Sequence, residues 1–191
     1  YILPVFLLLV TGSCSTEEIE PVPEPVVETV NRTVLVYMVA NNSLGVGSWD
    51  QADIAEMTMA VNSGALNGGR LLVYRHSTQG LPVLMELNSA GVTEHKVYDD
   101  ATYSVDVERM KEVFADVKHF APAEDYGLVL WSHVTGWAET NNSRSGIMKS
   151  FGDDRGITMK IPSLASALDG QGFSFIYFDC CHMSTVEVAY E

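Results

Sequence analysis

The sequence predicts an α/β fold, a layered sandwich around a largely parallel central sheet. Continuous apolar runs of strand length recur along the chain, and such runs are typical of strands buried on both faces. Segments with helical spacing of apolar residues lie between them, so that strand and helix alternate. With 191 residues, 47% of them apolar, the chain is long enough for one well-packed domain.

The predicted elements follow one another with short connections. Strands are predicted at 33–40, 70–74, 126–132 and 173–178, with a hairpin formed by 82–87 and 92–98. Helices are predicted at about 48–62, 104–120 and 161–168, with Ser104 as the N-cap of the second. Residues 41–45 and 138–150 are predicted to be loops, and residues 184–191 to begin another helix.

The first 13 residues are predicted to be a signal peptide. They carry no charge, and the apolar run Ile2–Val10 is too short to span a membrane. Small residues and then Cys14 follow, which resembles a bacterial lipobox, where the cysteine is lipidated. Acidic residues soon after Cys14 resemble the export tag of some Gram-negative lipoproteins. We therefore expect an exported protein that a lipid on Cys14 anchors in the outer membrane or at the cell surface. An ordinary secretory signal, giving a secreted protein, and a buried strand are the alternatives.

Residues 14–31 are predicted to be an extended tether, because they hold three prolines and five glutamates. The folded domain is predicted to cover 32–191. Its last residues form an apparently helical run that nothing ends, so we expect a domain truncated at its C-terminus.

Charge and cysteine content narrow the function classes. The formal net charge is −14 and no basic cluster occurs, which argues against nucleic acid as a partner. No glycine-rich phosphate loop is present. Besides Cys14, the cysteines are the adjacent pair Cys180 and Cys181, which is a strained arrangement for a disulfide. At least one of them is therefore predicted to have a chemical role.

Reactive side chains follow two of the predicted strands. Ligand sites of open α/β sheets lie beyond the carboxyl ends of the strands. His133 follows the third apolar strand, and Cys181 follows the fourth. If these strands are neighbours, a thiolate and an imidazole meet, which suits attack on a carbonyl with proton transfer to the leaving group. No metal is expected, because adjacent cysteines are not a zinc spacing.

The segments LVLWSHVTGW and FIYFDCCHMSTVEVAYE resemble the two catalytic blocks of the clostripain family, a branch of the caspase-like cysteine peptidases. The segments VLVYMVANNSLG and Ser150–Asp154 also resemble parts of that family. The resemblance runs from about residue 33 to residue 191. It implies a caspase-like α/β/α sandwich, of which this chain holds the N-terminal part, and a cysteine endopeptidase.

The resemblance also assigns roles to single residues. His133 matches the catalytic histidine and Cys181 the nucleophile, 48 residues apart, close to the spacing in caspases. The backbone N–H groups of Val134 and Cys181 match the oxyanion hole. Asp179 matches a pocket residue that implies cleavage after Arg or Lys. Cys180 stands where the family has alanine, which indicates a small buried residue.

Alternatives stay open at two of these positions. Val134 stands where the family has glycine, and a β-branched residue fits poorly where φ is positive. A non-catalytic surface lipoprotein that keeps the peptidase fold as a binding module is therefore the alternative function. Asp179 could instead cap the helix that is predicted after it. The histidines at 76, 95 and 119 lack supporting context and are predicted to be ordinary surface or core residues.

Family members are often made as zymogens that are cut between the two catalytic blocks. The predicted loop 138–150 contains Lys149 and Arg144, so self-cleavage is predicted after Lys149 or, second, after Arg144. The expected partners are peptides or proteins with Arg or Lys before the scissile bond. No cofactor is expected. Some relatives depend on calcium, and the sequence has no clear calcium loop, so calcium remains open.

Overall fold

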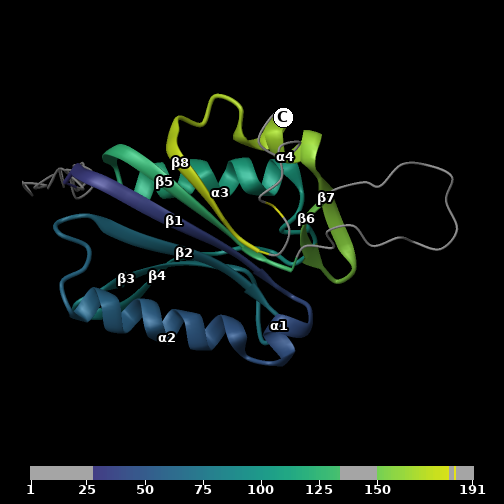
Figure 1. The fold of residues 1–191 in the computed structure, drawn as a ribbon, viewed down its shortest axis with the longest axis horizontal. Coiled ribbons are helices and arrows are strands. Elements are labelled where there is room, and N and C mark those ends of the chain that lie inside the picture. The colour runs from purple at the N-terminus through teal and green to yellow at the C-terminus, as the bar shows by residue number, and fades with distance from the viewer. Residues whose placement is uncertain (1–27, 134–149, 181–182, 184–191) are drawn as a thin grey trace, which may run out of the picture.

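The computed structural model describes residues 28–133, 150–180 and 183 (Figure 1). The predicted signal peptide and residues 14–27 of the predicted tether lie outside this part. In chain order the elements are β1 (Val30–Ala40), α1 (Ser43–Val46), α2 (Trp49–Asn62), β2 (Arg70–Ser77), β3 (Val83–Asn88), β4 (Gly91–Val97), α3 (Val107–Phe120), β5 (Ala123–Ser132), β6 (Ser150–Asp154), β7 (Ile157–Lys160), α4 (Ile161–Leu168) and β8 (Phe173–Asp179).

Six of these strands form one sheet in the order β4-β3-β2-β1-β5-β8. Strands β2, β1, β5 and β8 run parallel to one another. At one edge, β3 pairs antiparallel with β2, and β4 pairs antiparallel with β3. Strands β6 and β7 form a separate antiparallel pair. The predicted largely parallel sheet is confirmed. Strands β5 and β8, which precede His133 and Cys181, are neighbours, which is the condition for these two residues to meet.

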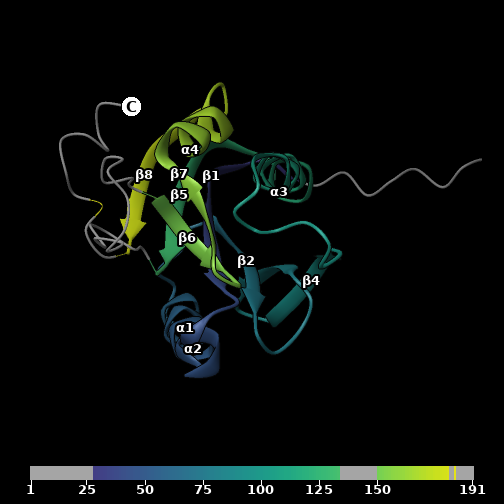
Figure 2. The same cartoon turned by 90° about the vertical axis from the view of Figure 1, so that its right-hand side faces the viewer.

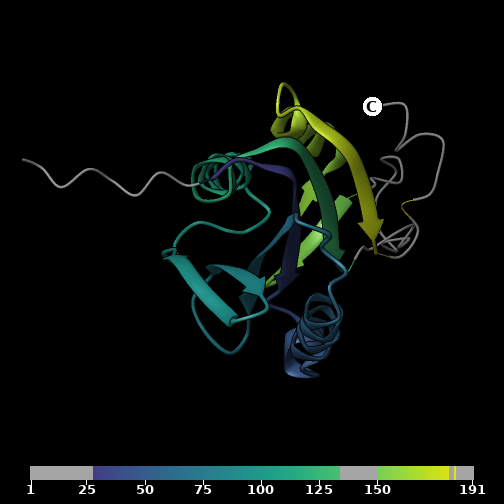
Figure 3. The ribbon, with the colours of Figure 1, turned by 90° about the vertical axis from the view of Figure 1, so that its left-hand side faces the viewer.

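Helices cover the two faces of the sheet, as Figures 2 and 3 show from opposite sides. Helix α2 packs on one face, and helices α3 and α4 pack on the other (Figure 1). Alternate residues of β1 supply the two cores, because successive side chains of a strand point to opposite faces. Tyr37 and Val39 face α3, whereas Val36 and Met38 face α2. The continuous apolar run of β1 is thereby explained.

Helix α3 begins later than predicted, and its N-cap is Asp106 instead of Ser104. The Asp106 carboxylate accepts the N–H groups of Glu108 and Arg109, which have no partner within the helix. Ser104 is fully buried and bonds to other parts of the chain. No helix among the described residues is both long and apolar enough to cross a membrane.

Other bounds differ in smaller ways. Strand β1 begins at Val30, so its first two residues belong to the predicted tether. Helix α1 begins within the predicted loop 41–45 and ends one residue beyond it. The β6–β7 hairpin begins at Ser150, the last residue of the predicted loop, and was not predicted as strand. Arg155 and Gly156 turn it with positive φ angles, and Phe151 buries its ring in the core.

Candidate active site

Three parallel strands, β1, β5 and β8, end at the same edge of the sheet. His133 directly follows β5, and Asp179 is the last residue of β8. Trp131 and Asp179 are partners in the β5–β8 register, so they lie side by side on neighbouring strands. The sheet therefore brings the histidine and the acidic residue predicted for the site to one place.

A depression of about 430 Å³ lies over these strand ends. It is lined by Leu44, Trp131, Ser132, His133, Tyr177, Phe178, Asp179 and Cys180. The lining combines aromatic and aliphatic walls with a histidine and a carboxylate, which is the usual make-up of a ligand site. Trp131 contributes both to this wall and to the core under α2.

The ring of His133 contacts helix α1. Its Nε2 atom lies 2.9 Å from the Ser43 Oγ atom. His133 is half-buried and Ser43 is exposed, so the contact lies at the surface beside the depression. Nothing in the sequence indicated this contact, because α1 is too short to give a periodic pattern.

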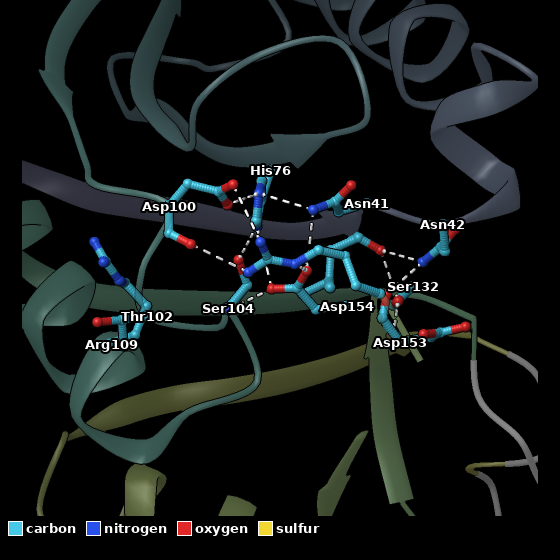
Figure 4. Close-up of polar contacts among 12 residues, drawn as sticks. Asn41, Asn42, His76, Asp100, Thr102, Ser104, Arg109, Ser132, Asp153 and Asp154 are labelled. Carbon is cyan, nitrogen blue, oxygen red and sulfur yellow. Dashed lines mark hydrogen bonds and ion pairs between the residues drawn. The ribbon is translucent and has the colours of Figure 1, made fainter. Parts of the chain in front are cut away.

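The backbone around that contact is held by a set of hydrogen bonds that Figure 4 shows. The Asn42 Nδ2 atom donates to the carbonyls of Val39 at 3.2 Å and Asp153 at 2.6 Å. The Ser132 Oγ atom donates to the same Val39 carbonyl at 2.7 Å and accepts from the Asp153 N–H at 3.3 Å. Asn42 and Ser132 therefore share both partners, and strand β6 is fastened to the ends of β1 and β5.

The acidic side of the site involves two carboxylates. The Trp131 Nε1 atom donates to Asp53 Oδ2 on α2 at 2.7 Å. Asp179 is exposed, yet partial burial of its carboxylate and then the negative charge of Asp53 raise the pKa of Asp179. Among the described residues no cation forms an ion pair with either carboxylate.

A buried polar network lies next to the site, and the sequence did not indicate it (Figure 4). His76, 1% exposed, contacts Asp154 Oδ2 at 3.2 Å and Ser104 Oγ at 2.7 Å through Nδ1, and Asp100 Oδ1 at 3.0 Å through Nε2. Asn41 Nδ2 lies 3.1 Å from both His76 Nε2 and Asp154 Oδ1. His76 is thus the centre of a network that joins β1, β2, β6 and the start of α3.

The carboxylate of Asp154 is the buried anion of this network. Burial by itself would raise the pKa of Asp154, but the hydrogen bonds from His76 and from the Ser104 N–H hold it below its ordinary value. The Ser104 N–H donates to Asp154 Oδ2 at 2.7 Å. The other two histidines are ordinary, as predicted: His95 pairs with Glu86 at 3.0 Å, and His119 is exposed.

Several predicted site residues lie outside the described part of the chain. These are Cys14, Val134, Arg144, Lys149 and Cys181. Of the described residues near Cys181, Cys180 packs against the α3–α4 core and Met183 is buried in that core. Within the described ranges, no group of three or more His, Cys, Asp or Glu side chains is arranged to hold a metal ion.

Solved structures resemble this chain over most of its length. A secreted C11 cysteine protease from Bacteroides thetaiotaomicron, solved with an irreversible peptide inhibitor, is 38% identical with a TM-score of 0.67, and the match covers 84% of this chain and 45% of that one. An inactive zymogen C11 protease from Parabacteroides distasonis is 33% identical with a TM-score of 0.69, covering 86% and 46%. The chain spans less than half the length of these two proteins. None of the curated proteins matches the chain.

The clostripain family model matches residues 36–191. This range includes every element from the middle of β1 onward, and with it the strand ends that surround the depression. The parallel sheet with helices on both faces is the arrangement of the two solved relatives. The chain therefore belongs to the clostripain family of cysteine peptidases and has a caspase-like α/β fold.

Proposed function

We propose that this chain forms part of a cysteine endopeptidase with His133 and Cys181 as its catalytic dyad. The observation that carries the proposal is the meeting of His133 and the Asp179–Cys180 strand end around one depression. Cys181 comes next in the chain. Cys180 packs partly against the core and also lines the depression, so the choice of Cys181 as the nucleophile rests on the resemblance of its block to the family.

The chemistry follows from these residue types. The Cys181 thiolate attacks the scissile carbonyl carbon, and the amine leaves with a proton from His133. Water then hydrolyses the thioester, with His133 taking up the proton. The N–H groups of Val134 and Cys181 are proposed to hold the oxyanion.

We propose Asp179 as the determinant of cleavage after Arg or Lys. It lines the depression, and the charge of Asp53 disfavours its ionised form. A guanidinium or ammonium group bound between the two carboxylates would remove that repulsion and pair with Asp179. Trp131 beside Asp179 would contact the aliphatic part of the same substrate side chain.

Self-cleavage is proposed to activate the protein, after Lys149 or, second, after Arg144. Both are basic, as the proposed specificity requires. Lys149 directly precedes Ser150, the first residue of β6. A cut there would leave the β6–β7 hairpin attached by its bonds to β1 and β5. Mass spectrometry of the full-length protein tests this: a cut after a non-basic residue, or an active protein with an intact 134–149 segment, would contradict it.

A pair of matched cysteine variants tests the choice of nucleophile, and a third variant tests the specificity. Full-length protein is incubated with a fluorogenic peptide that ends in Arg and with its citrulline counterpart, which is neutral but of similar shape. We expect turnover of the Arg peptide that Cys181→Ala abolishes and Cys180→Ala retains. Asp179→Asn is expected to lower the preference for Arg over citrulline. No turnover, with no change on Cys181→Ala, would favour the alternative of a surface binding module.

Export and lipid anchoring through Cys14 are also proposed. Support comes from the lipobox-like sequence, and one of the solved relatives is described as secreted. Labelling of cells with a palmitate analogue, followed by fractionation, tests the anchor. Cys14→Ser is expected to lose the label and to leave the membrane fraction. A labelled Cys14→Ser protein would refute lipidation at that residue.

A further inference from the structure

One nitrogen of the His133 ring is already engaged by another part of the chain. The Ser43 Oγ atom lies 2.9 Å from Nε2, a normal hydrogen-bond distance. In a neutral imidazole one nitrogen carries the proton and the other accepts, and the partner of one nitrogen fixes the role of the other. The Ser43 contact therefore bears on which nitrogen of His133 can exchange protons with a substrate.

Ser43 is held in place relative to His133 through the residues that precede both. Asn42 and Ser132 share the Val39 carbonyl and the Asp153 backbone as hydrogen-bond partners. The Asn42 Oδ1 atom also accepts the Leu44 N–H at 2.8 Å and thereby starts helix α1. The Ser43 hydroxyl thus approaches the ring from a fixed part of the backbone, which is what a positioning contact requires.

We propose that Ser43 is a positioning residue that accepts a hydrogen bond from Nε2–H of His133 and leaves Nδ1 to exchange protons in the reaction. This inference rests on the proposed function, since that is where His133 is assigned as the acid and base. A Ser hydroxyl can accept this bond while its own hydrogen faces solvent, because Ser43 is exposed.

Proton transfers balance with this assignment. In the thiolate state the ring carries protons on both nitrogens, and the Nε2–H bonds to Ser43. When the carbon–sulfur bond has formed, Nδ1 gives its proton to the departing amine. The neutral ring then keeps Nε2–H, so Nδ1 accepts a proton from the water that hydrolyses the thioester. Ser43 keeps its own proton throughout.

Two measurements on full-length protein test the proposal. The ¹⁵N NMR spectrum of labelled histidine reports which nitrogen of neutral His133 carries the proton, with His133→Ala identifying the signal. Turnover of the Arg peptide is measured for Ser43→Ala, Ser43→Thr and Ser63→Ala. Ser63 is the matched control, because its exposed hydroxyl lies at the far end of α2 and bonds only to its own helix.

In the unaltered protein we expect the neutral ring of His133 to carry its proton on Nε2. Ser43→Ala should lower kcat about threefold to tenfold with little change in KM, and Ser43→Thr should restore it, since one hydrogen bond is lost and regained. A proton on Nδ1, or full turnover by Ser43→Ala, would overturn the inference. The spectrum of the unaltered protein gives an answer even if a variant fails to fold. Turnover that persists in Cys181→Ala and His133→Ala would instead refute the proposed function.

Discussion

The indole Nε1 of Trp131 donates a hydrogen bond to Asp53 over 2.7 Å, which joins helix α2 to the strand that leads into His133. Trp131 is also the register partner of Asp179 on β8. Partners on neighbouring strands point to the same face of a sheet, so Asp179 faces the helix that carries Asp53. The negative charge of Asp53 therefore disfavours the ionised form of Asp179. Asp53 thus adds a second carboxylate to the acidic side of the site.

Asp53→Asn is expected to lower the pKa of Asp179. Asparagine keeps an oxygen that can accept the Trp131 hydrogen bond, while the charge that raises the pKa of Asp179 is removed. Partial burial still acts on Asp179, so only part of the shift should disappear. A ¹³C NMR titration of the aspartate carboxyl groups measures the change.

Glu56→Gln is the matched control for that titration. Glu56 lies on the same helix, is exposed and undergoes the same change of charge. It should leave the pKa of Asp179 unaltered. An equal decrease in the pKa of Asp179 in both variants would show a general effect of net charge. An unchanged pKa in Asp53→Asn would show that Asp53 does not act on Asp179.

Asp154→Asn is expected to lower the free energy of unfolding by about 2 kcal/mol or more near neutral pH, because a buried acceptor of several hydrogen bonds becomes a partial donor. The native pKa of Asp154 lies below its unfolded value of about 3.9. Its stabilising effect is therefore complete above about pH 4 and is lost as the pH falls through the native pKa.

Urea unfolding of the unaltered protein and Asp154→Asn over a pH series tests this dependence. The difference in stability between the two should be constant near neutral pH and should narrow as the medium becomes acidic. Asp169→Asn serves as the control, because Asp169 is exposed at the end of α4. A difference that widens in acid would contradict the role given to Asp154.

Gly45→Ala is expected to reduce both stability and turnover. A Cβ atom at this position would collide with the Ala40 carbonyl oxygen and lie 2.8 Å from Ser77 Oγ. Helix α1 would have to move, and Ser43 would move with it away from His133. Overpacking of this kind costs about 1–3 kcal/mol. Unfolding and peptide turnover are measured beside Gly80→Ala, where a Cβ meets nothing within 4 Å; equal behaviour of both variants would show that α1 tolerates displacement.

The strands that position the site were predictable from sequence because their signal is local. A continuous apolar run such as that of β5 indicates a strand buried on both faces. The sequence does not determine which strand lies beside β5, and the structure shows that it is β8. The residues His133 and Asp179 then meet at the strand ends without any knowledge of their side-chain contacts. The roles assigned to these residues came from the resemblance of the two blocks to a known family.

The contacts around His76 had no local signal. Its partners come from separate segments: Asn41 after β1, Ser104 before α3 and Asp154 at the end of β6. Burial of a polar residue depends on which distant segments supply hydrogen bonds, and no periodic pattern encodes that choice. The β6–β7 hairpin was missed for a related reason, since its short strands pair irregularly and are rich in turn-forming residues.

Ser104 and Asp106 offer a direct test of the revised start of α3. Asp106→Ala should lower the free energy of unfolding by about 1 kcal/mol, the usual effect of losing an N-cap.

Ser104→Ala should lower the free energy of unfolding at least as much, but for another reason. The buried hydroxyl of Tyr74 and the ring of His76 both lose their hydrogen-bond partner, the Ser104 hydroxyl. Combining Ser104→Ala with Tyr74→Phe separates the causes in urea unfolding. If Ser104 stabilises the buried network, the double variant should lose less free energy of unfolding than the two single variants lose together. Strictly additive losses, with no effect of Asp106→Ala, would show that Ser104 is the N-cap of α3.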